Sequence, residues 1–235
     1  MLKEPMKPNI SAFFPAYNEE KNIANTVHKA KAVLEQLAGD YEILVINDGS
    51  SDQTLAVARG LEAEFPKVKV INHEINRGYG GALKSGFYNA RYEWVAFTDS
   101  DGQFDFSELS KLLEKSSDSD LVVGYRLKRV EGFIRKLNAR LWGILIWLVF
   151  GLRVKDIDCA FKLIKKDVFD HIPKLESNGA LISAELLIRC RKADLKIAQV
   201  GVHHYPRLEG NPTGANLNVI IKAFKELLWL WKNLK

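Results

Sequence analysis

The stretch Trp94-Val95-Ala96-Phe97-Thr98-Asp99-Ser100-Asp101-Gly102-Gln103 decides the fold of this 235-residue chain. Its first four residues are apolar and partly β-branched or aromatic, which predicts a short buried strand over 94–97. Asp99 and Asp101 follow that strand two residues apart, and Gly102 lets the backbone turn away from it. Two carboxylates placed in this way are oxygen ligands suited to Mg²⁺ or Mn²⁺, which usually complete their coordination with substrate phosphates.

Two other interpretations of the same stretch compete with a metal site. Asp, Ser and Gly all favour turns and helix caps, so the stretch can also be purely structural. A calcium loop of the EF-hand type is excluded. Counted from Asp99, such a loop requires Gly where Phe104 stands and Glu where Ser110 stands.

The segments around this stretch alternate between strand and helix patterns. Strands are predicted over 10–14, 41–46, 68–71, 94–97 and 121–123, and helices over 23–37, 54–65, 82–90 and 106–115. Strands separated by helices of this length predict an α/β fold, three-layered and Rossmann-like, around a mostly parallel central sheet. We find no internal repeat, low-complexity tract or flexible linker, so a single domain is expected over 1–235.

The composition is that of a folded protein with a mild preference for anionic partners. Hydrophobic residues make up 47% of the chain and charged residues 27%, with a formal net charge of +5 and an isoelectric point near 9.0. Cys159 and Cys190 have no paired metal-ligand spacing, which predicts a reducing compartment. Residues 1–8 lack the apolar core of a signal peptide, and we expect a frayed lead-in there.

Polar residues concentrate directly after the predicted strands. These residues lie in four loops, 15–20, 47–52, 76–81 and 98–103. In open parallel sheets, ligands bind outside the carboxyl ends of the strands. Loop-forming propensity alone does not explain why a Tyr-x-Glu, an Asp-Gly-Ser and an Asp-x-Asp all fall at one edge.

Two phosphate-binding loops are rejected. Residues 78–83 resemble a dinucleotide fingerprint, but the last glycine is replaced by Leu83 and the segment follows the wrong strand. A P-loop over 78–85 fails at the same leucine. The glycines here are expected to let a helix N-terminus pack closely. Lys84 is then either available to a phosphate or structural.

Four motifs at the strand ends carry a family resemblance: Pro-Ala-Tyr-Asn-Glu-Glu (15–20), Asn-Asp-Gly-Ser-Ser-Asp (47–52), Asn-Arg-Gly (76–78) and Asp-Ser-Asp-Gly-Gln (99–103). The ordered set resembles the family 2 glycosyltransferases of GT-A fold, and more narrowly the branch of dolichol-phosphate mannose synthase and polyprenyl-phosphate glycosyltransferases. The likeness continues through Val-Val-Gly-Tyr-Arg (122–126), Asp156, Ala-Phe-Lys (160–162), Glu185, Tyr-Pro-Arg (205–207) and Gly210. The chain departs from the family at Asn47, where a first Asp is common, and in lacking the C-terminal membrane-spanning helices of many relatives.

The resemblance implies a donor site and a metal. A nucleotide-diphosphate-sugar, with either uracil or guanine as its base, would be bound by Pro15, Ala16, Tyr17, Glu19, Ile46, Asp48, Lys84, Asp99 and Ser100. The cofactor would be Mg²⁺ or Mn²⁺, held by Asp99, Asp101 and Gln103. Departure of the nucleoside diphosphate develops negative charge on its β-phosphate, and a bound cation stabilises that charge. Asp101 is therefore assigned a catalytic role, and attack from the opposite face would invert the anomeric carbon.

The nature of the acceptor decides which further residues the reaction needs. A lipid phosphate is already an anion at neutral pH and needs cationic side chains to position it, for which Arg126, Arg135 and Arg207 are the candidates. A sugar hydroxyl needs a carboxylate base instead, and Asp156 and Glu185 are the candidates for that role. Each arginine can equally be a solvated surface residue, and each carboxylate can equally cap a helix or pair with a lysine.

The second half of the chain favours a lipid acceptor. Between Arg126 and Lys155 the only acidic residue is Glu131, and the apolar stretch 141–152 contains Trp142, Trp147 and Phe150. That stretch is shorter than the roughly 20 residues that cross a bilayer. It suits either the membrane interface or a core helix. Residues 217–234 repeat the pattern, with a dimer contact as a third interpretation.

The chain is therefore expected to comprise a nucleotide-sugar-binding half (10–125), an acceptor-side half (126–216) and a C-terminal amphipathic helix (217–235). The predicted activity is inverting, metal-dependent transfer of a sugar to a polyprenyl or dolichyl phosphate. The protein would be peripheral on the cytoplasmic face of a membrane, and it can form oligomers. Two alternatives stay open: a saccharide hydroxyl acceptor, and a non-catalytic nucleotide-sugar-binding or membrane adaptor module. Nucleic-acid binding is not predicted, because the basic residues accompany an apolar helix and no groove-reading module.

Overall fold

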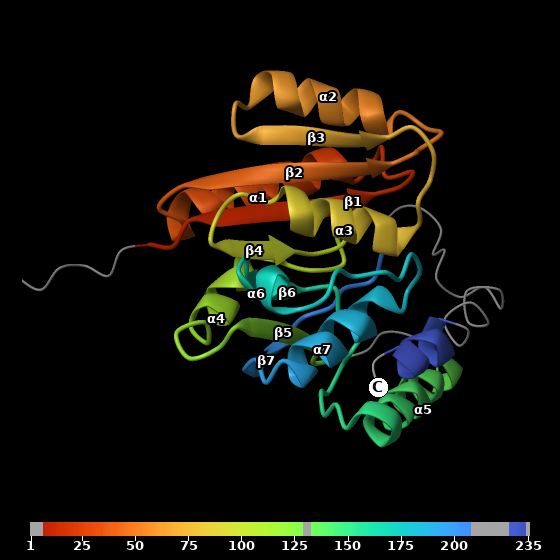
Figure 1. Ribbon diagram of the computed structural model, residues 1–235. Coiled ribbons are helices and arrows are strands. Elements are labelled where there is room, and N and C mark those ends of the chain that lie inside the picture. The colour runs from red at the N-terminus through yellow and green to blue at the C-terminus, as the bar shows by residue number, and fades with distance from the viewer. Residues whose placement is uncertain (1–6, 129–132, 208–225, 234–235) are drawn as a thin grey trace, which may run out of the picture.

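A seven-stranded sheet forms the centre of the computed structural model, which describes residues 7–128, 133–207 and 226–233 (Figure 1). Neighbouring strands follow the order β3-β2-β1-β4-β6-β5-β7. Strand β6 is antiparallel to β4 and β5, and the other neighbouring pairs are parallel. The strands are β1 (Ile10–Ala16), β2 (Tyr41–Asp48), β3 (Val68–His73), β4 (Trp94–Phe97), β5 (Leu121–Arg126), β6 (Lys162–Lys165) and β7 (Ile197–Val202).

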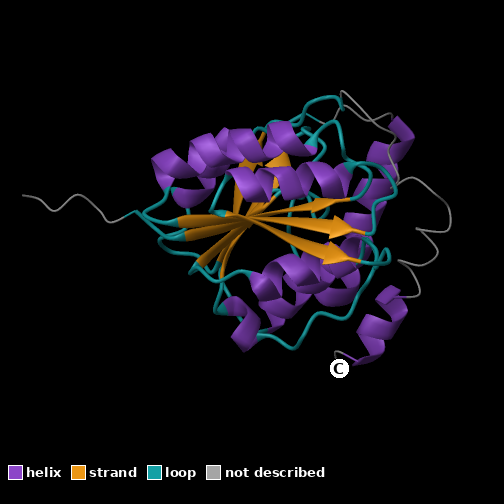
Figure 2. Cartoon of the chain, turned by 90° about the horizontal axis from the view of Figure 1, so that it is seen from above, coloured by secondary structure: helices purple, strands orange, loops and turns teal. Residues whose placement is uncertain are grey.

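Helices cover both faces of this sheet, which Figure 2 shows almost edge-on. One face packs against α1 (Ile23–Leu37), α2 (Thr54–Glu64) and α4 (Leu109–Leu113). The other face packs against α3 (Tyr79–Asn89), α5 (Phe133–Phe150) and α7 (Ile182–Lys192). The described secondary structure also includes the short elements η1 (Phe106–Glu108) and α6 (Val168–His171). The α/β, three-layer architecture expected from the sequence is confirmed.

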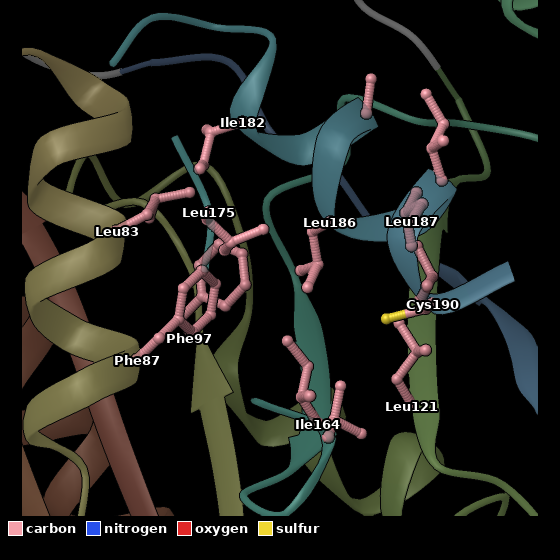
Figure 3. Packing of buried hydrophobic residues seen from close by; sticks show 14 of the residues in the cluster. Leu83, Phe87, Phe97, Leu121, Ile164, Leu175, Ile182, Leu186, Leu187 and Cys190 are labelled. Carbon is pink, nitrogen blue, oxygen red and sulfur yellow. The ribbon is translucent and has the colours of Figure 1, made fainter. Parts of the chain in front are cut away.

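Alternation along the strands divides the apolar side chains between two cores. In β1, Phe13 belongs to the core under α3 and α7, while Ala12 and Phe14 belong to the core under α1 and α2. This is the two-residue period of a strand that is buried on both faces. Figure 3 shows the α3–α7 side, where Phe87 and Phe97 lie close to each other, with ring centroids 5.3 Å apart.

Element boundaries agree with the sequence in the donor half, with a few differences. The strand over 94–97 has the predicted limits. Helix α3 begins at Tyr79, three residues before the predicted start at Ala82, because Gly80 and Gly81 continue the helix. The helix predicted over 106–115 is divided into η1 and α4.

The membrane-related segments are only partly described. Helix α5 extends from Phe133 to Phe150, so it begins before the apolar stretch that starts at Leu141. In the C-terminal segment, residues 226–233 are helical, and Leu227 and Leu230 are buried in the core under α3 and α7. Gly210 and residues 217–225 lie outside the described residues. Among the described helices, none combines the length and the apolar character needed to cross a bilayer.

Candidate active site

The acidic turn after β4 is tied to its surroundings by hydrogen bonds on both sides. Gly102 has a φ of +74°, and the amide of Gln103 donates to Asp101 Oδ1 at 3.0 Å, which closes the turn. Ser100 Oγ donates to the carbonyl of Pro15 at 2.8 Å, and Thr26 Oγ1 donates to the carbonyl of Ser100 at 3.0 Å. The turn is therefore fixed to the end of β1 and to α1, as the placement of Pro15 and Ser100 in one site requires.

Two carboxylates from different loops converge on one cation. Arg207 donates to Glu19 Oε1, and its Nη1 lies 3.5 Å from Asp101 Oδ2. Segment 203–207 brings Arg207 there by pairing with the turn: Tyr205 N donates to the Gln103 carbonyl at 2.8 Å, and Gln103 Nε2 donates to the Tyr205 carbonyl at 2.9 Å. The sequence assigned Arg207 to the acceptor, and the structure brings it to the donor-side carboxylates. Gln103 itself contacts this segment.

At the same turn, the surroundings of Asp99 disfavour its ionised form. Its Oδ1 accepts a hydrogen bond from the hydroxyl of Tyr79 at 3.0 Å. Burial, and after it the negative charge of Asp101, raise the pKa of Asp99 to about 7. Burial also raises the pKa of Tyr79 well above its usual value, so this hydroxyl stays a donor. A cation bound nearby would favour the ionised form of Asp99 and lower its pKa.

The donor set fits a divalent metal that is shared with a substrate. Within residues 7–128, 133–207 and 226–233, there is no cluster of three or more His, Cys, Asp or Glu side chains that could enclose a metal. Mg²⁺ and similar ions are commonly held by one or two carboxylates, with substrate phosphates as further ligands. The guanidinium of Arg207 between Glu19 and Asp101 shows that this position favours positive charge.

Asp48, at the end of β2, is buried and accepts several hydrogen bonds. Its Oδ1 lies 2.7 Å from His73 Nδ1 and 2.9 Å from the amide of Arg77. The other ring nitrogen of His73 lies 2.8 Å from Ser85 Oγ. The sequence analysis missed His73 and Tyr79. Tyr79 lies beside the quoted Asn-Arg-Gly motif, whereas His73 has no motif of its own.

The loops after β1 and β2 are joined to each other. Asn18, with a φ of +56°, accepts from the amide of Ser51 at 2.8 Å, and the amide of Glu19 donates to Thr54 Oγ1 at 2.8 Å. Tyr17 is exposed on this edge, as a base-contacting residue would be. Ala16 ends β1, and the side chain of Ile46 is buried in the hydrophobic core.

Lys84 contacts a loop from the second half of the chain. Its Nζ donates to the carbonyl of Glu176 at 3.1 Å and to Asn178 Oδ1 at 2.7 Å. The same loop lies against the N-terminus of α3, where a Cβ on Gly80 would lie 2.4 Å from the carbonyl oxygen of Ser177. Close packing is thus the function of this glycine, as expected. A phosphate contact for Lys84 stays a prediction.

On the acceptor side, Arg126 and Asp156 form a bidentate ion pair. Arg126 Nε lies 2.7 Å from Asp156 Oδ2, and Nη2 lies 2.9 Å from Oδ1. Both residues line a pocket of about 290 Å³, together with Arg140, Trp142 and Lys155. Arg135 lies in α5, in the part of that helix whose side chains are not described.

Glu185 is fully buried in α7. It forms an ion pair with Arg189 at 2.7 Å, and its two oxygens accept from the amides of Glu176 and Ser177 at 3.0 and 2.8 Å. These contacts fix the loop that Lys84 also holds. The structure thus brings together Pro15, Glu19, Asp99, Ser100, Asp101 and Arg207, and it places Arg126 with Asp156 and Glu185 with Arg189.

The chain is similar to known proteins in both sequence and structure. Residues 11–173 match the family model described as Glycosyl transferase family 2. A "Glycosyltransferase AglD" of Haloferax volcanii is 30% identical over 207 residues, which are 84% of this chain and 33% of that protein. A dolichyl-phosphate beta-glucosyltransferase of Drosophila melanogaster is 28% identical, over 86% of this chain and 68% of its own.

Two further proteins are similar to this chain, one in sequence and one in structure. An undecaprenyl-phosphate 4-deoxy-4-formamido-L-arabinose transferase of Sodalis glossinidius is 32% identical, over 72% of this chain and 53% of its own. The chain therefore spans from about a third to about two thirds of the length of these three relatives. Glucosyl-3-phosphoglycerate synthase from Mycobacterium tuberculosis, solved with Mn²⁺, UDP and glucosyl-3-phosphoglycerate, superposes with a TM-score of 0.74. It is 21% identical, and the match covers 96% of this chain and 80% of that one. This likeness shows a common fold.

Proposed function

Because the chain belongs to glycosyl transferase family 2, we propose that it transfers a sugar from a nucleotide-diphosphate-sugar to a polyprenyl or dolichyl phosphate. The names of two relatives, a dolichyl-phosphate glucosyltransferase and an undecaprenyl-phosphate sugar transferase, support this class of acceptor. The transfer would invert the anomeric carbon, because the acceptor attacks from the face opposite the leaving diphosphate.

One observation favours a phosphate acceptor over a hydroxyl acceptor: both candidate bases are engaged in ion pairs. Asp156 is held by Arg126 through two hydrogen bonds, and Glu185 is held by Arg189 and two backbone amides. These contacts occupy the carboxylate oxygens with which a base would have to accept the proton of a hydroxyl acceptor. A phosphate acceptor is already ionised and needs no base, so these engaged carboxylates do not hinder the reaction.

The pocket next to Arg126 has the chemistry of a lipid phosphate site. Arg126, Arg140 and Lys155 supply three positive charges against the two carboxylates of Asp156 and Asp158, and Trp142 supplies an apolar wall. Arginine is suited to phosphate because its guanidinium carries five N–H donors and stays charged at every physiological pH. In this proposal Arg126, oriented by Asp156, positions the attacking oxygen.

On the donor side, Asp101, Asp99 and Gln103 would hold Mg²⁺ or Mn²⁺ with the donor's phosphates, and the bound cation would stabilise the negative charge on the departing diphosphate. The solved M. tuberculosis protein with Mn²⁺ and UDP supports a divalent ion of this kind. Asp48, fixed by His73 and the Arg77 amide, and Tyr17 would contact the nucleoside. Glu19, Ser100, Pro15 and Ala16 line the same edge.

We place the protein peripherally on the cytoplasmic face of a membrane, because the acceptor would be a membrane lipid. Helix α5 supports this placement, since Leu141, Ile144 and Leu148 are exposed on it. Exposed apolar residues on a helix with basic neighbours are typical of interfacial helices.

A radiolabelled transfer assay tests the proposal. UDP- and GDP-sugars are incubated with the protein, Mg²⁺ or Mn²⁺, and one of three acceptors: dolichyl phosphate, undecaprenyl phosphate or a free saccharide. Label that moves into the lipid fraction, with an anomeric configuration opposite to that of the donor, is the expected result. Label that enters only the saccharide would contradict the proposed acceptor. Donor binding without any transfer would favour a non-catalytic binding module.

A further inference from the structure

Helix α5 presents a line of exposed apolar side chains, here called the α5 stripe. It consists of Leu141, Ile144 and Leu148, which are 54%, 42% and 69% exposed. Their spacing of three and four residues places them on one face of the helix. Ile146 is fully buried and fixes the opposite face to the core. The stripe is therefore held in a defined orientation.

A groove adjoins the C-terminal end of this helix, and we call it the α5 groove. Its volume is about 590 Å³, and its lining includes Trp147, Arg153, Arg191 and Asp194. Trp147 directly precedes Leu148 of the stripe, so the groove and the apolar face meet there. The groove is distinct from the pocket around Arg126. Val154 is the one described residue that lines both.

Arg153 and Trp147 form an amphipathic pair at the mouth of the groove. The guanidinium carbon of Arg153 lies 5.2 Å from the centre of the Trp147 ring, which is a cation–π distance. Trp147 is itself 41% exposed. A tryptophan beside an arginine, next to exposed aliphatic residues, is the composition that settles at the boundary between lipid headgroups and acyl chains.

Arg191 packs closely against Gly151 at the end of α5. A Cβ built on Gly151 would lie 3.1 Å from Arg191 Nη2, so a larger residue there would require the guanidinium to shift by a few tenths of an ångström. Gly151 has a φ of +67°, which also favours glycine at the end of α5. The end of the helix therefore borders the guanidinium of Arg191.

The two arginines give the groove a surplus of positive charge. Within the described part of the chain, neither Arg153 nor Arg191 forms an ion pair, and Asp194 is the one carboxylate in the lining. Two guanidiniums against one carboxylate leave one net positive charge. Both guanidiniums line the same groove, and guanidinium donors match the oxygens of a phosphate.

From this juxtaposition we infer that the α5 groove binds the phosphate of an anionic phospholipid headgroup while the α5 stripe enters the apolar layer. Charge favours this occupant over a second copy of the chain, because the chain carries a formal net charge of +5 and an anionic headgroup is negative. The inference shares with the proposed function only the position at a membrane. It concerns lipids that are not consumed in the reaction.

Vesicle flotation without donor or acceptor tests the inference. Vesicles of phosphatidylcholine alone are compared with vesicles that also contain phosphatidylglycerol, using the full chain and the R153Q/R191Q variant. Each arginine near an anionic surface contributes about fivefold to partitioning, so the double variant should bind the anionic vesicles about 25-fold more weakly. The charge-matched control is R59Q/K69Q, on α2 and β3. Figure 1 shows α2 and α5 at opposite ends of the molecule, so this control should bind like the parent.

Other outcomes would overturn the inference. Equal binding of the parent to both kinds of vesicle, or unchanged binding of R153Q/R191Q, would show apolar insertion without a headgroup site. A dimer in light scattering that L148E dissociates would assign the stripe to a copy of the chain. Transfer to a short-chain acceptor in detergent is measured separately, so loss of vesicle binding with retained transfer distinguishes this inference from the proposed function. Thermal unfolding confirms that each surface variant is folded.

Discussion

On the donor side, Glu19 and Asp101 converge from two loops on the guanidinium of Arg207, whereas on the acceptor side Asp156 and Glu185 each hold an arginine of their own. The donor-side carboxylates come from loops and share one cation. Glu185, by contrast, is buried in a helix, where its oxygens also accept from two amides. We therefore expect a carboxylate's partners, more than its place in a motif, to separate the residues that bind a ligand from those that hold the fold or orient an arginine.

The largest effect is expected from Asp101→Asn, which keeps the shape of the side chain and removes its charge. Turnover should fall by about 10²–10³-fold, the range seen when one group that stabilises transition-state charge is removed. Calorimetry should show that Mn²⁺ no longer strengthens nucleotide binding. Asp105→Asn is the control, because Asp105 is exposed and caps η1 by accepting a hydrogen bond from the amide of Ser107. Metal-dependent binding that survives in Asp101→Asn would contradict this assignment.

Chelation tests the proposed donor-side metal without a mutation. Addition of EDTA should abolish transfer and weaken nucleotide binding, because the donor's phosphates would lose their counter-charge. The melting temperature without nucleotide should change little, since Arg207 already spans Glu19 and Asp101. A large fall in melting temperature on chelation would instead indicate a structural metal.

Glu185→Ala should act on stability. Removing one partner of a buried ion pair leaves the other uncompensated, and the free energy of unfolding should fall by about 3–5 kcal/mol. Glu176→Gln is the matched control, since Glu176 meets the same Arg189 but its side chain is 56% exposed, and less than about 1 kcal/mol is expected there. Denaturant unfolding measures both. A Glu185→Gln variant with unchanged stability and lost turnover would favour the role of a base.

Arg126→Lys should change acceptor use by a smaller amount. Lysine keeps the charge and loses the planar fork that pairs with Asp156, so the KM for the lipid phosphate should rise about tenfold while donor binding stays constant. Arg140→Lys, in the same pocket, is exposed and should change this KM by less than about twofold. Steady-state kinetics with both substrates separates these effects.

Lys84→Met should have the smallest effect. It removes two hydrogen bonds to the loop at Glu176 and Asn178, which should cost about 1 kcal/mol of stability and leave nucleotide affinity within about twofold. A tenfold loss of nucleotide affinity would instead support a phosphate contact for this lysine.

The donor edge could be predicted from sequence because its determinants are local. An apolar run followed by a polar loop predicts both a strand and the residue at which that strand ends. The strand over 94–97 was predicted with its observed limits. The resemblance then named Pro15, Glu19, Ser100 and Asp101 as one site, and their hydrogen bonds and ion pairs connect them.

The acceptor side could not be predicted in the same way, because its partners are distant or non-local in pattern. Asp156 and Arg126 are 30 residues apart in the sequence, and no sequence motif or spacing predicts that they form a pair. Strand β6 was missed because Lys162 interrupts its apolar pattern, although this lysine is fully buried and donates to the carbonyl of Cys159. Burial lowers the pKa of Lys162, a cost that sequence alone does not reveal.

The antiparallel strand β6 also has a consequence for the order in which the chain folds during synthesis. It lies between β4 and β5 and pairs with both. While only the first 126 residues have been made, neither β4 nor β5 has this neighbour. The edges that β6 covers can pair with other chains until residues 162–165 have left the ribosome, and the second edge of β5 stays open until β7 is made, so we expect the nascent chain to be prone to aggregation in that interval. One four-residue strand therefore turns two stretches of sequence into a single cooperative unit.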